Sequence, residues 1–277
     1  SKKGEKYDAL PPSVSIALLG GVFLLLLYFG TYFQGLHMQW GLIATEWLLL
    51  FVPVVAVIYV SRVDFVKALS LRLPRWQHLV AALFMTPSAL VLAGHLSSWQ
   101  NKYMPMPENM VKGLAKLFET DGTVAGFCLA FFAVAISPAV CEELLFRGAI
   151  MSALRKRRLH RIGIIIIVGI LFGAFHLSVH RFLSVTMLGF SMTYLALRSR
   201  SIYTSILSHA LNNGGGFLLA GGFLPTWLVK VDKLEVLAKE GFPWWATLLA
   251  VTTLVASVYV MEKVEPVPFE DEETNSN

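Results

Sequence analysis

Two adjacent carboxylates and an arginine stand in a segment that is otherwise hydrophobic enough to enter a lipid bilayer. The segment is SPAVCEELLFR, residues 137–147, and its charged residues are Glu142, Glu143 and Arg147. Each ionisable group inside a membrane costs about 2.5–3.5 kcal/mol, so such a cluster indicates a functional site. On a helix Glu143 and Arg147 can pair, which leaves the Glu142 carboxylate available for chemistry. The alternative is a closed ion-pair network that only fixes helix packing.

Two other apolar segments carry polar residues of the kind that hydrolysis requires. FGAFH ends at His176, and HALNN begins at His209 and contains Asn212 and Asn213. At about 1.5 Å per residue from the cytosolic end of each expected helix, these residues and Glu142 fall in one layer about 12–22 Å deep. A carboxylate that activates water, a histidine that orients it and neutral donors for an oxyanion are the groups that hydrolysis needs.

The composition places these segments in an integral membrane protein. Hydrophobic residues make up 56% of the 277 residues and charged residues only 15%, compared with about a quarter in soluble domains. The net charge is +5. In a polytopic chain basic residues collect in cytosolic loops and bind lipid headgroups, so we expect membrane lipids as partners and no nucleic acid.

Apolar runs separated by polar loops predict an all-α fold, a polytopic bundle of about eight transmembrane helices. Two segments that are too polar to span, 97–123 and 229–237, have apolar residues at helical spacing and predict amphipathic surface helices. Pro138 is the expected kink in the long fourth span. The expected spans are 14–32, 45–60, 78–96, 124–154, 162–177, 182–197, 202–220 and 244–261.

The ends of the chain are polar, and the basic residues predict how the chain crosses the membrane. Residues 1–13 form a polar N-terminal segment, 14–261 one transmembrane domain, and 262–277 an acidic tail of the composition typical of disorder. Most Lys and Arg residues, including those of the loop 155–161, lie on the same side of the membrane as the termini. The positive-inside rule therefore predicts both termini in the cytosol and a site open towards the cytosol. We expect the plasma membrane of a prokaryote.

Three short motifs resemble those of a known protease family. EELLFR at 142–147 fits E-E-x-x-x-R, FGAFH at 172–176 fits F-x-x-x-H, and HALNN at 209–213 fits H-x-x-x-N. In this order, and in a polytopic chain, they resemble the CPBP intramembrane proteases, which include the type II CAAX prenyl endopeptidases. The resemblance covers about residues 124–215.

The resemblance implies an intramembrane endopeptidase that hydrolyses a peptide bond near the membrane with a glutamate-activated water. By position it implies Glu142 as general base, His176 as its partner, and His209 and Asn213 as oxyanion donors. The implied substrate is a prenylated CAAX-type protein or another hydrophobic or membrane-anchored peptide, and no cofactor is implied. The implied supporting residues are Glu143, Arg147, Phe172 and, as an alternative donor, Asn212.

Other readings of the same residues remain open. Glu142, His176 and His209 could instead be ligands of a zinc ion. His180 stands four residues after His176 as a second ligand might, but it falls in a loop beside Arg181. An ion pathway would also use carboxylates and histidines within the membrane. The chain could also be a non-catalytic scaffold or immunity protein, or work with another membrane subunit.

Overall fold

The computed structural model describes residues 7–157, 159–223 and 242–268, and the regular elements in these ranges are all helical. The all-α prediction is confirmed for this part of the chain. The described α-helices are α1 (Pro12–Leu25), α2 (Thr31–Leu36), α3 (Met38–Ala44), α4 (Val52–Val60), α5 (Phe65–Ala68), α6 (Trp76–Tyr103), α7 (Glu108–Ala115), α8 (Val124–Phe131), α9 (Ser137–Glu143), α10 (Met151–Lys156), α11 (Arg161–Phe175), α12 (Phe182–Ser199), α13 (Ile202–Ala220) and α15 (Trp244–Lys263).

Several of these helices are continuous with one another and long enough to cross a membrane. π-helical turns join α1 to α2, α3 to α4, and α8 through α9 to α10. Within the described ranges five helices have the length and apolar character of a span. Exposed apolar side chains such as Tyr28 and Tyr59 suit contact with lipid. The five spans are Pro12–Leu36, Met38–Val60, Trp76–Tyr103, Val124–Lys156 and Trp244–Lys263.

The predicted number of about eight spans is not confirmed. The segments expected at 162–177, 182–197 and 202–220 form α11, α12 and α13, which are not among the five. Helix α11 is too short, whereas α12 and α13 carry polar residues that they bury against neighbouring helices. The expected surface helix in 97–123 is present as α7, which buries none of its residues. The other expected surface helix, 229–237, lies outside the described residues.

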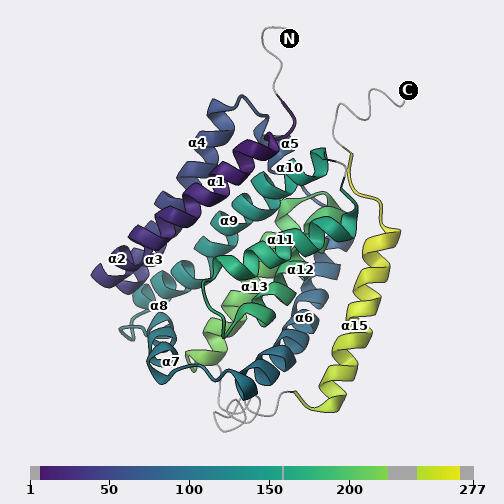
Figure 1. Ribbon diagram of the computed structural model, residues 1–277. Coiled ribbons are helices and arrows are strands. Elements are labelled where there is room, and N and C mark those ends of the chain that lie inside the picture. Colours follow the sequence, from purple (N-terminus) through teal and green to yellow (C-terminus); the bar gives the residue numbers. More distant parts are fainter. Residues whose placement is uncertain (1–6, 158, 224–241, 269–277) are drawn as a thin grey trace.

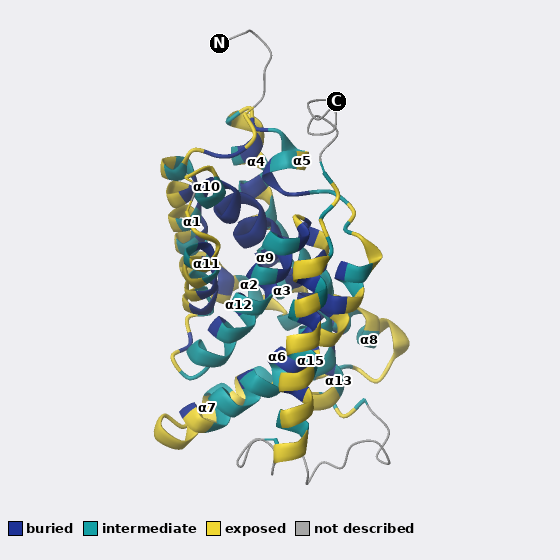
Figure 2. Cartoon of the chain, turned by 90° about the vertical axis from the view of Figure 1, so that its right-hand side faces the viewer, coloured by how far each residue is buried: buried dark blue, intermediate teal, exposed yellow. Residues whose placement is uncertain are grey.

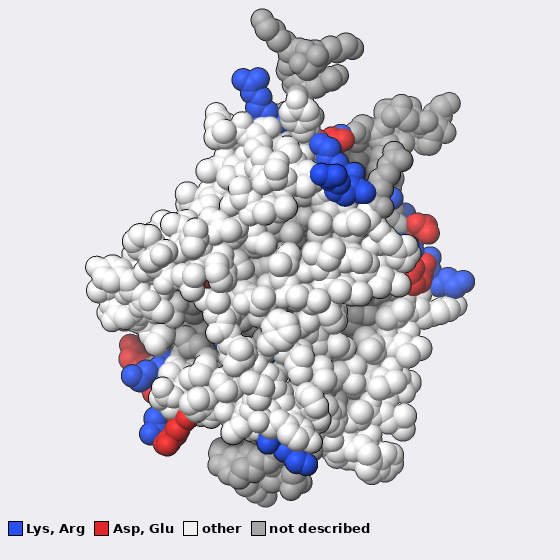
Figure 3. All heavy atoms as spheres, viewed as in Figure 1, with Lys and Arg blue, Asp and Glu red and all other residues white. Residues whose placement is uncertain are grey.

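The helices form a bundle with the motif-bearing segments at its centre. Helices α1 to α4 lie on one side, α6 and α15 on the other, and α9 to α13 between them (Figure 1). Buried residues concentrate around α9 and α10, whereas α1 and α15 are largely exposed (Figure 2). On the face shown in Figure 3, charged side chains gather near the two ends of the bundle and leave a broad uncharged band between them. Such a band is what a hydrocarbon layer requires.

Glycines allow α11 and α12 to approach closely. Gly169 and Gly173 stand four residues apart on α11, and a Cβ atom at Gly169 would overlap the ring of Phe190 on α12. A Cβ atom at Gly189 would lie 3.0 Å from the Cα atom of Gly169. Small residues at this spacing are a common means of packing membrane helices. The close approach brings the backbone of α12 within reach of side chains on the fourth span.

Pro138 interrupts the hydrogen bonding of the fourth span, as its sequence position predicts. It has no N–H to donate to the carbonyl of Val134, four residues earlier. A π-helical turn, Phe132–Ile136, ends directly before α9. The Val134 carbonyl instead accepts a hydrogen bond of 3.1 Å from Nδ2 of Asn213 on α13. The proline therefore provides the acceptor that anchors one of the predicted site residues.

The C-terminal segment is ordered further than its composition suggests. Helix α15 continues to Lys263, and Glu262 forms ion pairs with Arg161 and Arg198, each at 3.1 Å. The carbonyl of Val267 accepts a 2.6 Å hydrogen bond from Arg72. The predicted disordered tail therefore does not begin at residue 262, because arginines on three other segments hold residues 262–267. Residues 269–277 lie outside the described part.

The start of the described chain, the basic loop and the C-terminal segment share one end of the bundle. The Lys156 ammonium lies 5.7 Å from the centre of the Tyr7 ring, and Arg161 pairs with Glu262. This arrangement is consistent with termini on a common side, whereas the side itself stays a prediction.

Cysteine labelling in intact cells checks the predicted orientation. In a Cys128→Ser background, Leu159→Cys should react with an impermeant thiol reagent only after the cells are opened, because its 42% exposed side chain lies in the basic loop. Val124→Cys, 81% exposed at the opposite end of the fourth span, is the matched control and should react from outside. Labelling of residue 159 in sealed cells would reverse the predicted orientation.

Candidate functional site

A fully buried ion pair lies at the centre of the fourth span. Nη1 of Arg147 lies 2.7 Å from Oε1 of Glu143, and neither side chain is exposed. The predicted pair is therefore present. Arg147 also donates to the carbonyl of Gly189 at 3.0 Å and to Oγ1 of Thr193 at 3.3 Å, both on α12. The arginine thus links the fourth span to α12 as well as neutralising a carboxylate.

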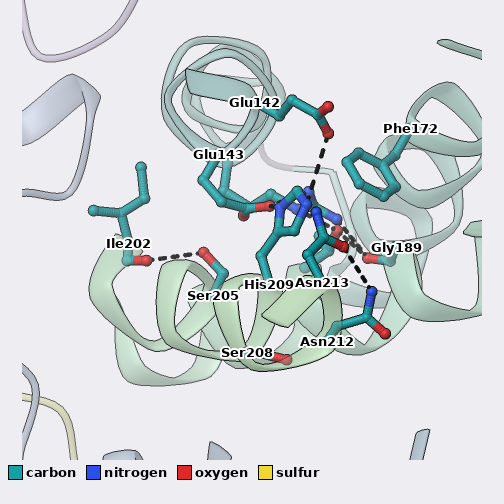
Figure 4. Close-up of polar contacts among 12 residues, drawn as sticks. Glu142, Glu143, Phe172, Gly189, Ile202, Ser205, Ser208, His209, Asn212 and Asn213 are labelled. Carbon is teal, nitrogen blue, oxygen red and sulfur yellow. Dashed lines mark hydrogen bonds and ion pairs between the residues drawn. The ribbon is translucent and has the colours of Figure 1, made fainter. Parts of the chain in front are cut away.

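His209 lies between the two glutamates (Figure 4). Its Nδ1 atom is 2.9 Å from Oε1 of Glu143. Because that carboxylate is paired with Arg147 and only accepts hydrogen bonds, Nδ1 must carry the proton. In the neutral imidazole, Nε2 then bears a lone pair, and it lies 3.9 Å from Oε2 of Glu142. Arg147, Glu143, His209 and Glu142 therefore form one continuous polar chain.

Of the two glutamates, Glu142 is the one that makes no direct hydrogen bond with the described residues. Its Oε2 atom is buried and accepts no hydrogen bond from the residues that the structure describes. The 3.9 Å to His209 is longer than a hydrogen bond. The i,i+4 spacing of Glu143 and Arg147 predicts this arrangement, in which one carboxylate is neutralised and the other is available.

His176 makes its described hydrogen bond within its own helix. It follows the last residue of α11, and its Nδ1 atom lies 2.9 Å from the carbonyl oxygen of Phe172. A carbonyl can only accept, so Nδ1 carries the proton. No described hydrogen bond or ion pair joins His176 to Glu142. The structure therefore places His209 beside the Glu142 carboxylate, and the role of His176 as a partner of Glu142 stays a prediction.

Phe172 is the apolar surface around which the charged and imidazole groups pack. Its ring centre is 4.8 Å from that of His176, 5.7 Å from that of His209 and 4.4 Å from Cζ of Arg147. A guanidinium over an aromatic face is stabilised by the ring quadrupole. The three sequence motifs therefore meet at this phenylalanine, which positions residues from three helices.

The two asparagines of α13 form a unit. Nδ2 of Asn212 donates to Oδ1 of Asn213 at 3.0 Å, and Nδ2 of Asn213 donates to the Val134 carbonyl at 3.1 Å. The amide orientation of Asn213 is thereby fixed, because a carbonyl cannot donate. Its second N–H has no acceptor among the described residues, so Asn213 is better placed than Asn212 to act as a donor.

The suggested zinc ligands do not form a metal-binding cluster. Within residues 7–157, 159–223 and 242–268, no three or more His, Cys, Asp or Glu side chains are arranged to hold a metal ion. His180 is turned away from the site, since its Nδ1 atom lies 3.1 Å from the carbonyl of Met104. His176 and His180 therefore do not act as a pair of ligands in this structure.

Two charged residues outside the three motifs also face the site. Glu46, in the second span, is 5% exposed, and its charge acts on Glu142 across the contact between the π-helical turn Thr45–Phe51 and α9. Arg181, between α11 and α12, acts electrostatically on Glu142 and on His176. Glu46 could have been predicted from the sequence, because a lone carboxylate in an apolar span is energetically unfavourable and therefore indicates a function. Arg181 could not have been predicted in this way, because it lies in the loop after the apolar segment that ends near His176.

Comparison with known proteins identifies the family of this region. Residues 124–215 match the model of the family described as type II CAAX prenyl endopeptidase Rce1-like, and this range contains all three motifs. Neither the curated proteins nor the solved structures gave a match to the chain. The resemblance read from the motifs is confirmed at the level of the family, which is one of proteases and hence hydrolases. Residues 124–215 of this integral membrane protein are therefore similar to the type II CAAX prenyl endopeptidase Rce1-like family.

Proposed function

We propose that the chain is an intramembrane endopeptidase that hydrolyses a peptide bond with a water activated by Glu142. The observation that carries the proposal is the polar chain in which the Arg147–Glu143 ion pair fixes His209 beside Glu142. A carboxylate–histidine pair that fixes a tautomer and directs Nε2 at the reacting group is a recurrent feature of hydrolytic sites. The Rce1-like match supports an endopeptidase of the CAAX type at family level.

The geometry suggests how water is activated. The 3.9 Å between Oε2 of Glu142 and Nε2 of His209 is a separation that one water molecule can bridge. Glu142 takes a proton from this water as its oxygen attacks the carbonyl carbon of the scissile bond. The protonated Glu142 then donates to the nitrogen of the leaving amine, which restores the carboxylate. His209 orients the water, and His176, whose ring also packs against Phe172, is a second imidazole that can assist it.

The oxyanion is assigned to donors on α13. Asn213 is held by the Val134 carbonyl through one amide N–H, which leaves the other for the oxygen of the tetrahedral intermediate. Asn212 supports this orientation by donating to Oδ1 of Asn213. His209 is assigned as a second oxyanion donor, as the resemblance of the motifs implies.

The proposed substrate is a prenylated CAAX-type protein or another hydrophobic, membrane-anchored peptide in the plasma membrane of a prokaryote. The test is to incubate the detergent-purified chain with a prenylated CAAX peptide, its unprenylated form and a panel of hydrophobic peptides. Mass spectrometry then locates each cleaved bond. Cleavage by the wild type but not by Glu142→Gln supports the proposal, whereas intact peptides throughout contradict it.

Metal removal separates the glutamate-base mechanism from a zinc mechanism. Activity should survive exhaustive chelation, because no three His, Cys, Asp or Glu side chains of the described residues are arranged to hold a metal ion and the buried Arg147 beside Glu143 repels a second cation. Cleavage rates before and after chelation are compared, with a known zinc protease treated in parallel as the control. Loss of cleavage that zinc alone restores would reassign Glu142, His176 and His209 as ligands.

A further inference from the structure

Arg181 places a positive charge near the proposed active site, and no described ion pair uses this charge to stabilise the fold. It is the residue before α12 and lies in the turn that follows His176. Its side chain is partly buried, and its Nε atom is enclosed with no hydrogen-bond partner among the described residues. No described ion pair includes its guanidinium, so it is not in direct contact with the Glu142 carboxylate.

The charge of Arg181 nevertheless acts on the groups proposed to perform the reaction. The Glu142 charge acts on the Arg181 guanidinium, and the Arg181 charge acts on His176. Burial lowers the pKa of the Arg181 guanidinium, and the Glu142 charge opposes that shift. A partly buried cation that has neither a hydrogen-bonded counterion nor full hydration is a favourable place for an anion to bind.

The turn that carries Arg181 is held in place on both sides. Gln100 of α6 donates to the carbonyl of Val179 and accepts from the N–H of Leu183 at 3.4 Å. Ser178, only 8% exposed, also has a hydroxyl oxygen with no partner among the described residues. Two unsatisfied polar groups therefore occur one turn apart in a segment that is already fixed.

We propose that Arg181 binds a carboxylate of the peptide substrate and so selects peptides with a negative charge a few residues from the scissile bond. The inference rests on the proposed function. A guanidinium matches a carboxylate with two parallel hydrogen bonds. An extended peptide spans about 3.3–3.6 Å per residue, so a carboxylate two or three residues from the reacting carbonyl can reach a group that faces Glu142 without touching it. The C-terminal carboxylate and an Asp or Glu side chain are the two sources with this chemistry.

Three versions of one cleaved peptide distinguish these sources. The first ends in a free carboxylate three residues after the scissile bond, the second is its amide, and the third is the amide with Glu as last residue. The wild type should cleave at least one carboxylate-bearing version with a kcat/KM about 10- to 100-fold above that of the plain amide, mainly through KM. Arg181→Gln should bring that ratio close to one, and Arg181→Lys should give an intermediate ratio because it keeps the charge without the planar fork.

The control variant is Arg157→Gln, which removes an exposed arginine beyond the other end of α11 and should leave the ratio unchanged. Equal cleavage of all three peptides by the wild type would overturn the inference while the proposed function stands. A uniform loss on all three peptides in Arg181→Gln would also overturn it, since that pattern marks a structural role. If no version is cleaved, the proposed function itself fails.

A product-inhibition measurement on the wild type covers the case in which Arg181→Gln does not fold. The tripeptide released from the first version should inhibit cleavage about 10-fold more strongly as the free acid than as the amide. Equal inhibition by acid and amide would contradict the inference.

Discussion

Glu142→Gln is expected to lower the turnover of peptide cleavage by a factor on the order of 10²–10⁴ while leaving the protein folded. Glutamine keeps the size of the side chain but cannot take a proton from water. The Oε2 atom of Glu142 makes no direct hydrogen bond with the described residues, so its replacement breaks no contact that supports the fold. The measurement is the rate of product formation by mass spectrometry, together with the thermal unfolding midpoint in detergent.

Two further glutamate variants serve as comparisons. Glu143→Gln should lower both activity and stability, because Glu143 holds Arg147 and His209. Glu108→Gln changes an exposed glutamate that pairs with Lys112 on α7, and it should alter neither quantity. A Glu142→Gln protein with wild-type turnover would remove Glu142 from the role of general base.

Arg147→Ala is expected to cost about 3–5 kcal/mol of stability, because it leaves the fully buried Glu143 carboxylate without its counterion. It also removes the donors to Gly189 and Thr193 and the contact with the Phe172 ring. The yield of folded protein, its unfolding midpoint and its cleavage rate should all fall. Size-exclusion chromatography and thermal unfolding in detergent measure the first two.

A double variant separates the lost charge balance from the lost contacts. Arg147→Met combined with Glu143→Gln removes both charges, so it should recover part of the stability but not the activity. Arg161→Ala is the matched control, because its ion pair with Glu262 is exposed and is worth about 0–1 kcal/mol. Wild-type stability in Arg147→Ala would mean that the Glu143–Arg147 pair does not lie in a low-dielectric environment.

The hydropathy of the sequence predicts some of the membrane-spanning helices but not all of them. It identifies α1 to α4, α6, the fourth span and α15, whose outer faces are apolar. It leaves α11 to α13 undecided, because α11 is short and because α12 and α13 bury polar residues such as Thr193 and His209 against neighbours. Whether a partly polar helix crosses the membrane depends on the helices around it, and a single sequence window does not contain that information.

The sequence by itself determined the all-α membrane class, the Glu143–Arg147 pair and the three motifs of the family. The class follows from composition, the pair from local periodicity, since residues four apart on one helix share a face, and the motifs from their resemblance to a known family. Only the tertiary structure decided that His209 lies beside Glu142, that Asn213 binds the Val134 carbonyl, and that Glu46 and Arg181 face the site. The physical reason is that periodicity defines the faces of one helix, whereas the glycine contacts between α11 and α12 and the missing N–H of Pro138 decide which faces meet.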